Sequence, residues 1–124
     1  MGKYIMVVDD SPTIRVSVEF ALKAVGIPVE QAENGADALK KIRAMTEKGD
    51  TIAMGIIDVN MPQMDGISFI KNFRKDDKFT PLIVLTTESE EHKIQEGKDA
   101  GASGWIVKPF QPAELLGVVQ RFIR

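Results

Sequence analysis

The sequence contains no cysteine, which excludes disulfide bonds, thiol catalysis and thiolate metal sites. It also lacks a long apolar run, since stretches such as 5–8 and 82–85 are far shorter than the roughly 20 residues that span a bilayer. The first residues lead into a short apolar segment without a small-residue cleavage site, so no secretory signal is predicted. We therefore expect a cytoplasmic protein that does not enter a membrane.

An excess of either charge is also missing, because 16 Lys and Arg residues and 18 Asp and Glu residues leave a net charge of −2. A sequence-blind nucleic-acid binder would need a basic excess, so we expect no nucleic-acid partner. The hydrophobic content of 44% and the charged content of 27% are those of a globular protein. The length of 124 residues predicts one domain, spanning residues 1–124.

Five short apolar segments punctuate the chain and predict strands. They are residues 4–8, 29–32, 52–57, 82–86 and 105–107. Stretches with helical apolar spacing lie between them, over about 12–25, 36–47, 67–73, 89–100 and 111–124. This alternation predicts an α/β fold, a doubly wound parallel sheet with helices on both faces. Residues 89–100 carry few apolar side chains, so we expect this helix to pack lightly and to move easily.

Polar residues follow four of the five predicted strands, at the edge where ligands bind in such sheets. They are Asp9, Asp10 and Ser11 after the first strand, Asp58 after the third, Thr86, Thr87 and Glu88 at the fourth, and Lys108 after the fifth. Crowded carboxylates raise one another's pKa unless a cation intervenes. Lys108 offsets one charge, and Mg²⁺ is the divalent ion best suited to offset the rest.

Carboxylates, a hydroxyl, an ammonium and Mg²⁺ together suit phosphoryl transfer, which depends mostly on positioning and electrostatic stabilisation. A carboxylate can itself be the nucleophile and form an aspartyl phosphate. Asp58 is the candidate nucleophile because it ends the central strand. Asp9 and Asp10 are adjacent and are better placed to hold a metal from one side.

Each of these residues also has a purely structural interpretation. Asp10 or Ser11 can cap the helix that follows, and Lys108-Pro109 can be an ordinary loop. Asp65-Gly66 is interpreted as a turn, and the charged run 74–78 as a solvated loop. The functional interpretation therefore depends on all four strand ends carrying complementary groups together.

Four longer motifs surround these residues: VVDDS (7–11), DVNMPQMDG (58–66), TTE (86–88) and AGASGWIVKPF (100–110). They resemble those of bacterial response regulator receiver domains, most closely the stand-alone chemotaxis regulators of the CheY type. The motifs follow one another in the family's order over essentially the whole chain. The resemblance implies a flavodoxin-like (βα)₅ fold with a five-stranded parallel sheet in the order 2-1-3-4-5.

The resemblance also implies the chemistry of the acidic residues. Asp58 would accept a phosphoryl group from a phosphohistidine of a partner kinase. Asp9 and Asp10 would hold Mg²⁺ together with the side chain of Asp58 and the backbone carbonyl of Asn60. The protein would catalyse its own phosphorylation and dephosphorylation and would not turn over a substrate.

Further residues are implied to read or tune the phosphoryl group. Thr86 and Lys108 would contact its oxygens. Thr86 and Trp105 would form the switch, with Trp105 turning inward behind Thr86 and changing the surface built from residues 89–124. Asn60 and Glu88 would set the rate at which the phosphoryl group is lost.

A signalling switch and not an enzyme is therefore expected, acting as a monomer. The implied partners are a sensor histidine kinase of the CheA type, a flagellar motor switch protein as target, and a phosphatase. Because the sequence ends directly after the last predicted helix, output is expected through a partner. The alternatives are a single-domain phosphorelay intermediate, a Mg²⁺-dependent aspartyl-phosphate phosphatase and a flavin carrier. The phosphatase would need Asp-x-Asp on the first strand, and the flavin carrier a Ser/Thr-rich phosphate loop.

Overall fold

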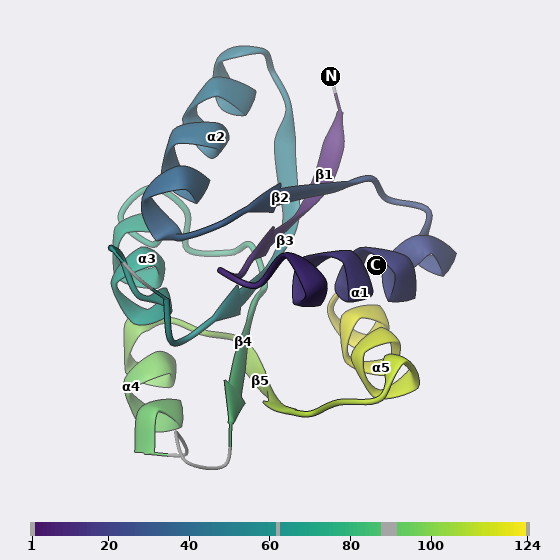
Figure 1. The fold of residues 1–124 in the computed structure, drawn as a ribbon. Coiled ribbons are helices and arrows are strands. Elements are labelled where there is room, and N and C mark those ends of the chain that lie inside the picture. Colours follow the sequence, from purple (N-terminus) through teal and green to yellow (C-terminus); the bar gives the residue numbers. More distant parts are fainter. Residues whose placement is uncertain (1, 62, 88–91, 124) are drawn as a thin grey trace.

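The computed structural model describes residues 2–61, 63–87 and 92–123. Its strands form a five-stranded sheet in the order β2-β1-β3-β4-β5, and all neighbouring strands are parallel (Figure 1). The strands are β1 (Lys3–Val8), β2 (Val29–Ala32), β3 (Thr51–Asp58), β4 (Leu82–Thr87) and β5 (Gly104–Lys108). The flavodoxin-like fold and the strand order implied by the resemblance are confirmed.

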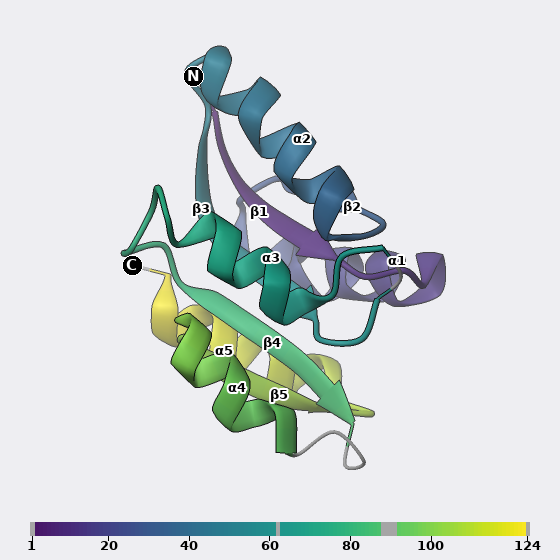
Figure 2. The same ribbon diagram turned by 90° about the vertical axis from the view of Figure 1, so that its left-hand side faces the viewer.

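Helices cover both faces of this sheet. They are α1 (Pro12–Ala21), α2 (Gly35–Glu47), α3 (Gly66–Phe73), α4 (His92–Ala100) and α5 (Pro112–Phe122), with the 3₁₀ turn η1 (Leu22–Val25) after α1. α1 and α5 lie against one face, and α2, α3 and α4 against the other, in front of the sheet in Figure 2. The sheet is therefore doubly wound, as predicted.

Each face of the sheet has its own apolar core, because successive residues of a strand point to opposite faces. In β1, Ile5 and Val7 belong to the core beneath α1 and α5, whereas Met6 and Val8 belong to the core beneath α2, α3 and α4. All four side chains are buried. This double coverage explains why the strand is a continuous apolar run in the sequence.

The first helical stretch differs from the prediction in its helix type. The α-helix ends at Ala21, and the chain continues as a 3₁₀ turn to Val25, where Gly26 with φ 79° ends it. Residues three apart share a side in a 3₁₀ helix, so Leu22 and Val25 both face the core beneath α1 and α5. The apolar spacing thus identified the buried residues but not the tighter winding.

α4 begins at His92 in the described part of the predicted helix 89–100. Among the described residues of this helix only Gly97 is buried, and Ile94 is half-buried. The expectation of light packing is therefore confirmed. Within the described ranges, none of the helices has both the length and the apolar character that crossing a bilayer requires.

The charged run 74–78 is not simply a solvated loop, and that interpretation was wrong for Arg74. The Arg74 side chain is only 14% exposed. Its Nε donates to the backbone oxygen of Gly101 at 3.0 Å, and its Nη1 donates to that of Asp77 at 3.1 Å. Arg74 therefore joins the end of α3 to the α4–β5 connection, a contact between distant parts of the chain that local composition does not reveal.

Candidate functional site

Three aspartates converge where β1 and β3 end. One carboxylate oxygen from each of Asp9, Asp10 and Asp58 lies within 4.8 Å of the other two. The strand register explains the convergence, since Val8 pairs with Ile57 and the next residue on each strand is an aspartate. Asp9 and Asp58 are buried, whereas Asp10 is exposed. The predicted gathering of carboxylates at this edge is present in the structure.

Lys108 reaches into this cluster from the end of β5. Its Nζ lies 3.3 Å from Oδ2 of Asp9 and 3.3 Å from Oδ2 of Asp58. The side chain crosses the end of β4 to do so, because β4 lies between β3 and β5. The ammonium is thus shared by the two buried carboxylates, which a purely structural loop at Lys108-Pro109 would not predict.

The electrostatic balance of the cluster favours protonation of Asp58. Burial, together with the charge of Asp9, raises the pKa of Asp58 to about 6 against the opposing effects of Lys108 and of the Asn60 N–H. Burial by itself would lower the pKa of Lys108, but attraction to Asp58 and Asp9 outweighs it and leaves that pKa raised. At Asp58 the charge of Asp9 has a larger effect than the charge of Lys108, so this one ammonium does not cancel the charge of the neighbouring carboxylates.

A divalent cation fits this donor set. Carboxylate oxygens are the ligands that Mg²⁺ prefers, and the exposed Asp10 leaves one side of the cluster open to solvent, as bound waters require. The only ammonium that the described residues place against the three carboxylates is that of Lys108. The predicted Mg²⁺ ligands Asp9, Asp10 and Asp58 therefore lie together in an arrangement that suits the ion.

Thr86 carries a buried hydroxyl beside this cluster. Its Oγ1 is fully buried and, within the described part of the chain, has no hydrogen-bond partner. Leaving such a group unpaired costs about 1–3 kcal/mol. Thr86 follows Leu85, which pairs with Asp58 across β3 and β4. Its position and its unpaired donor suit an acceptor oxygen carried at Asp58.

The loops that hold the aspartates are closed by short hydrogen bonds. Asp9 Oδ1 accepts from the backbone N–H of Ser11 at 2.9 Å, and Asp58 Oδ1 accepts from that of Asn60 at 3.3 Å. Ser11 caps α1 by accepting the N–H of Ile14 at 3.3 Å. The capping interpretation is therefore correct for Ser11, and it leaves the carboxylate of Asp10 available to the cluster.

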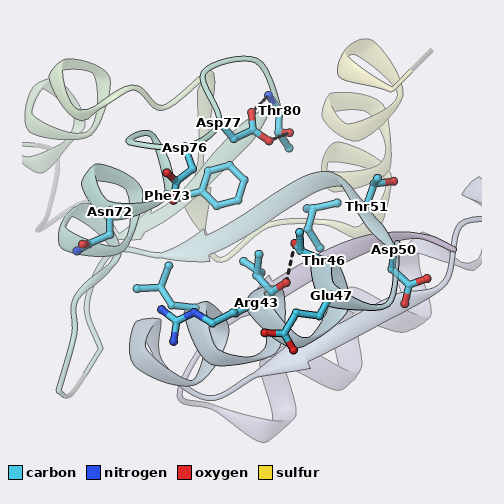
Figure 3. A pocket seen from close by; sticks show the side chains of 13 residues that line it. Arg43, Thr46, Glu47, Asp50, Thr51, Asn72, Phe73, Asp76, Asp77 and Thr80 are labelled. Carbon is cyan, nitrogen blue, oxygen red and sulfur yellow. Dashed lines mark hydrogen bonds between the residues drawn. The ribbon is translucent and has the colours of Figure 1, made fainter. Parts of the chain in front are cut away.

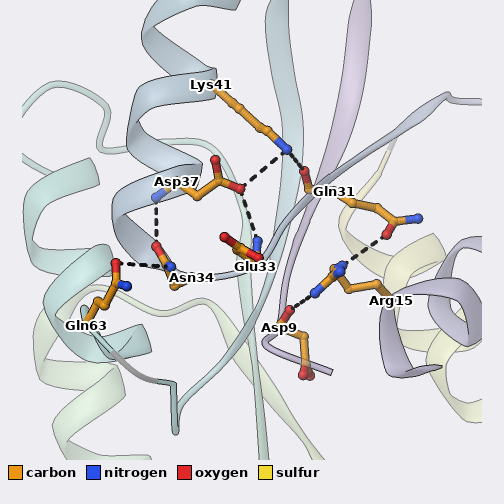
Figure 4. A network of polar contacts seen from close by, with 8 residues as sticks. All are labelled: Asp9, Arg15, Gln31, Glu33, Asn34, Asp37, Lys41 and Gln63. Atoms are coloured by element: carbon orange, nitrogen blue, oxygen red, sulfur yellow. Dashed lines mark hydrogen bonds and ion pairs between the residues drawn. The ribbon is translucent and has the colours of Figure 1, made fainter. Parts of the chain in front are cut away.

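Arg15 supports the site although no motif marked it. Its Nη1 donates to the backbone oxygen of Asp9 at 2.5 Å, and its Nε donates to Oε1 of Gln31 on β2 at 3.1 Å (Figure 4). Gln31 in turn donates to Glu19 of α1 at 2.7 Å. These contacts hold the β1–α1 connection, and with it Asp9, against the edge strand.

The loop after Asp58 is held from the β2–α2 connection. Asn34, which is buried, caps α2 by accepting the N–H of Asp37 at 2.8 Å and donates its Nδ2 to Gln63 at 3.4 Å (Figure 4). Gln63 has φ 66°, in the left-handed region. The contact of Gln63 with Asn34 thus ties the β3–α3 connection to the start of α2.

Asp65-Gly66 is more than a turn, which corrects the sequence interpretation. Asp65 caps α3 by accepting the N–H of Ser68 at 2.8 Å. A Cβ atom at Gly66 would overlap the backbone oxygen of Asp58 and lie 2.9 Å from Cα of Val59. Glycine is therefore required for α3 to start directly behind Asp58, a requirement that depends on the path of the loop.

We expect Gly66→Ala to lower the free energy of unfolding by about 1–3 kcal/mol, because the added methyl group displaces the backbone at Asp58. Urea unfolding monitored by circular dichroism measures this. Gly117→Ala in α5 is the matched control, since its Cβ meets nothing within 4 Å, and it should raise stability by about 0.5–1 kcal/mol. Equal stability of Gly66→Ala and the unmodified chain would show that the loop accommodates the methyl group without loss of folding free energy.

The remaining predicted site residues lie at or near this edge of the sheet. Trp105 on β5 is 42% exposed, and Asn60, two residues after Asp58, is also exposed. Their roles in switching and in loss of the phosphoryl group stay predictions. Glu88, the other residue predicted to tune that loss, lies outside the described residues.

A cavity of about 670 Å³ lies elsewhere, between α2, α3 and the start of β3. Figure 3 shows Arg43 and Glu47 on one side of it and Asn72, Phe73 and Asp76 on the other. None of the described residues that line it belongs to the aspartate cluster. The candidate site is therefore identified by the chemical groups at the strand ends and not by the volume of this cavity.

Comparisons with known proteins agree with this fold. The family model described as the response regulator receiver domain matches residues 5–120. The chain is 42% identical to the structure of chemotaxis protein CheY4 of Vibrio cholerae, over 99% of this chain and 100% of that chain, with a TM-score of 0.86.

Two relatives of the chain are named as transcriptional regulatory proteins. The alkaline phosphatase synthesis transcriptional regulatory protein PhoP of Bacillus subtilis is 37% identical over 100% of this chain and 50% of its own length. The transcriptional regulatory protein PrrA of Mycobacterium tuberculosis is 36% identical over 97% of this chain and 49% of its own length. The chain thus spans about half the length of these relatives.

Proposed function

The chain belongs to the family of response regulator receiver domains, the switch domains of two-component signalling, and we propose that Asp58 is the residue that becomes phosphorylated in it. One observation carries this proposal: Asp58 is buried at the end of the central strand, within 4.8 Å of Asp9 and Asp10 and 3.3 Å from the ammonium of Lys108. Apart from its neighbours Asp9 and Asp10, no other aspartate among the described residues lies in such a cluster. Exposure to a small phosphodonor with Mg²⁺ should add one phosphoryl group to the intact mass of the chain.

The groups of the site account for the transfer. A carboxylate oxygen of Asp58 forms a bond to phosphorus while the bond from phosphorus to the imidazole nitrogen of the donor breaks, and that nitrogen keeps the electron pair. The ammonium of Lys108, 3.3 Å from Asp58, and the unpaired hydroxyl of Thr86 would donate to the phosphoryl oxygens. Asp9, Asp10, Asp58 and the backbone carbonyl of Asn60 would hold Mg²⁺, which supplies positive charge against the approaching anion.

Thr86 and Trp105 form the proposed route from the phosphoryl group to the surface. Once Thr86 donates to a phosphoryl oxygen, its side chain is drawn toward Asp58 and leaves room behind it. Trp105 then moves inward, and the surface of α4, β5 and α5 changes. The light packing of α4 supports this, because switching elements have low local stability. Among the described residues of α4, only Gly97 is buried.

We further propose that the switch acts in chemotaxis, as a cytoplasmic monomer. The support is the 42% identity to CheY4, which this chain matches over that protein's full length. The partners would then be a histidine kinase of the CheA type and a flagellar motor switch protein, with Asn60 and Glu88 setting the phosphoryl lifetime. A phosphorelay intermediate is the alternative, and it would pass the group to a histidine of another protein.

Target binding distinguishes these functions. With Mg²⁺ and beryllium fluoride as the phosphoryl mimic, the chain should bind a purified flagellar motor switch protein at least about 10-fold more tightly than without the mimic, by isothermal titration calorimetry. Asp58→Asn with the same additions is the control and should show no gain. Rapid transfer of the phosphoryl group to a histidine phosphotransfer protein, without binding to the motor protein, would instead establish the relay.

A further inference from the structure

Lys98 on α4 lies over the face of the indole ring of Trp105 on β5. Its Nζ is 4.3 Å from the ring centroid, well inside the roughly 6 Å over which a cation is attracted to an aromatic face. Among the described residues, no carboxylate lies within 4.0 Å of this ammonium. The ring of Trp105 is therefore the partner that the structure shows for the charge of Lys98.

The strand register places Trp105 on the same face of the sheet as Thr86. Trp105 pairs with Val84 and Val107 pairs with Thr86, so residues 84 and 86 share a face with 105 and 107. α4 covers this face, as its contacts with β4 show. Movement of the indole toward Thr86 is thus movement along the face of the sheet that α4 covers.

The approach of α4 to the sheet brings Lys98 to this position. Gly97 is the buried residue of the helix, and a Cβ there would lie 3.7 Å from a methyl group of Val84. Lys98 follows directly and projects over the neighbouring strand, where Trp105 is 42% exposed.

We propose that Lys98 is a positioning residue that holds Trp105 in its outward position and thereby opposes the switch. The proposal rests on the proposed function, in which inward movement of Trp105 accompanies phosphorylation. Loss of the ammonium at an exposed site should change the ratio of outward to inward Trp105 by about two- to fivefold. Lys98 would then set how much of the chain is active before and after phosphorylation.

The test uses the unphosphorylated full chain, in which Trp105 is the single tryptophan. Lys98→Met keeps the length of the side chain without its charge, Lys98→Arg keeps the charge, and Lys93→Met removes a charge from the same helix. The readouts are acrylamide quenching of the Trp105 fluorescence and the chemical shift of the indole N–H. We expect reduced quenching and a shifted indole signal in Lys98→Met, with wild-type values in Lys98→Arg and Lys93→Met.

Unchanged or increased quenching in Lys98→Met would overturn the proposal, because it would show that the indole stays outward without the ammonium. Urea unfolding of each variant excludes a loss of folding as the cause. A phosphodonor titration then separates the two claims: Lys98→Met should reach half of its fluorescence response at about two- to fivefold less donor than wild type. If wild type forms no phosphoryl adduct, the proposed function fails, while the quenching result still decides the role of Lys98.

Discussion

Asp58→Asn should abolish the phosphoryl adduct that the wild-type chain forms with a small phosphodonor and Mg²⁺. The carboxamide has nearly the same shape as the carboxylate but lacks the anionic oxygen that forms the bond to phosphorus. The contacts of Lys108 with Asp9 remain, so the rest of the site should keep its arrangement. Intact-mass spectrometry after donor treatment measures the result, with a full adduct in wild type and none in the variant.

One control accompanies this variant. Asp76→Asn removes an exposed carboxylate outside the cluster and should leave the adduct unchanged. An adduct of equal amount in Asp58→Asn and wild type would place the acceptor on another residue and contradict the proposed function.

The stability of Asp58→Asn shows whether the variant is folded. The pKa of Asp58 is raised to about 6 in the folded chain against 3.8 for an ordinary Asp, so the folded state binds this proton more tightly than the unfolded state. Stability therefore falls as the pH rises from about 4 to 6, and at pH 7 the ionised Asp58 disfavours folding. Without Mg²⁺, Asp58→Asn should be about 1–3 kcal/mol more stable than wild type at pH 7 in urea unfolding.

Asp10→Ala should weaken Mg²⁺ binding by at least about 10–100-fold, the loss seen even for residues that only support metal ligands. Asp10 is the exposed member of the cluster, so its removal should cost little folding stability. Isothermal titration with MgCl₂ measures the affinity, and Asp76→Ala, which removes a comparable exposed charge, should bind like wild type. Wild-type affinity in Asp10→Ala would exclude Asp10 as a ligand.

The same titration should depend on pH because Mg²⁺ and a proton compete for Asp58. Above about pH 6 the carboxylate is ionised and available, and below it the affinity should fall by about tenfold per pH unit. In Asp58→Asn this dependence should disappear, although the remaining affinity is lower.

The strands and their burial on both faces could be predicted, because a strand covered on both faces must be apolar throughout, as Ile5 to Val8 are. Parallel strands end at one edge, so Asp9, Asp58 and Lys108 could be placed together before any contact was known. Helix type was less predictable, because the same apolar spacing runs through α1 and η1 and both bury their apolar residues in one core.

Residues that act through the path of a loop could not be recognised in the same way. Arg15 contacts a backbone oxygen of Asp9, and Arg74 contacts one of Gly101, and neither contact requires a particular residue type at the accepting position. Gly66 is required only because α3 begins directly behind Asp58. Such contacts leave no pattern in the composition or spacing of the sequence.

The sequence by itself determined the alternation of strands and helices, the edge at which the polar groups collect and the identity of the groups, because these follow from periodicity and from the direction of parallel strands. Only the tertiary structure decided which carboxylates are buried, that Lys108 is shared between Asp9 and Asp58, and that Lys98 covers Trp105. Burial and side-chain distance depend on how separate elements pack, and residues far apart in the chain acquire those properties only when the sheet and its helices assemble.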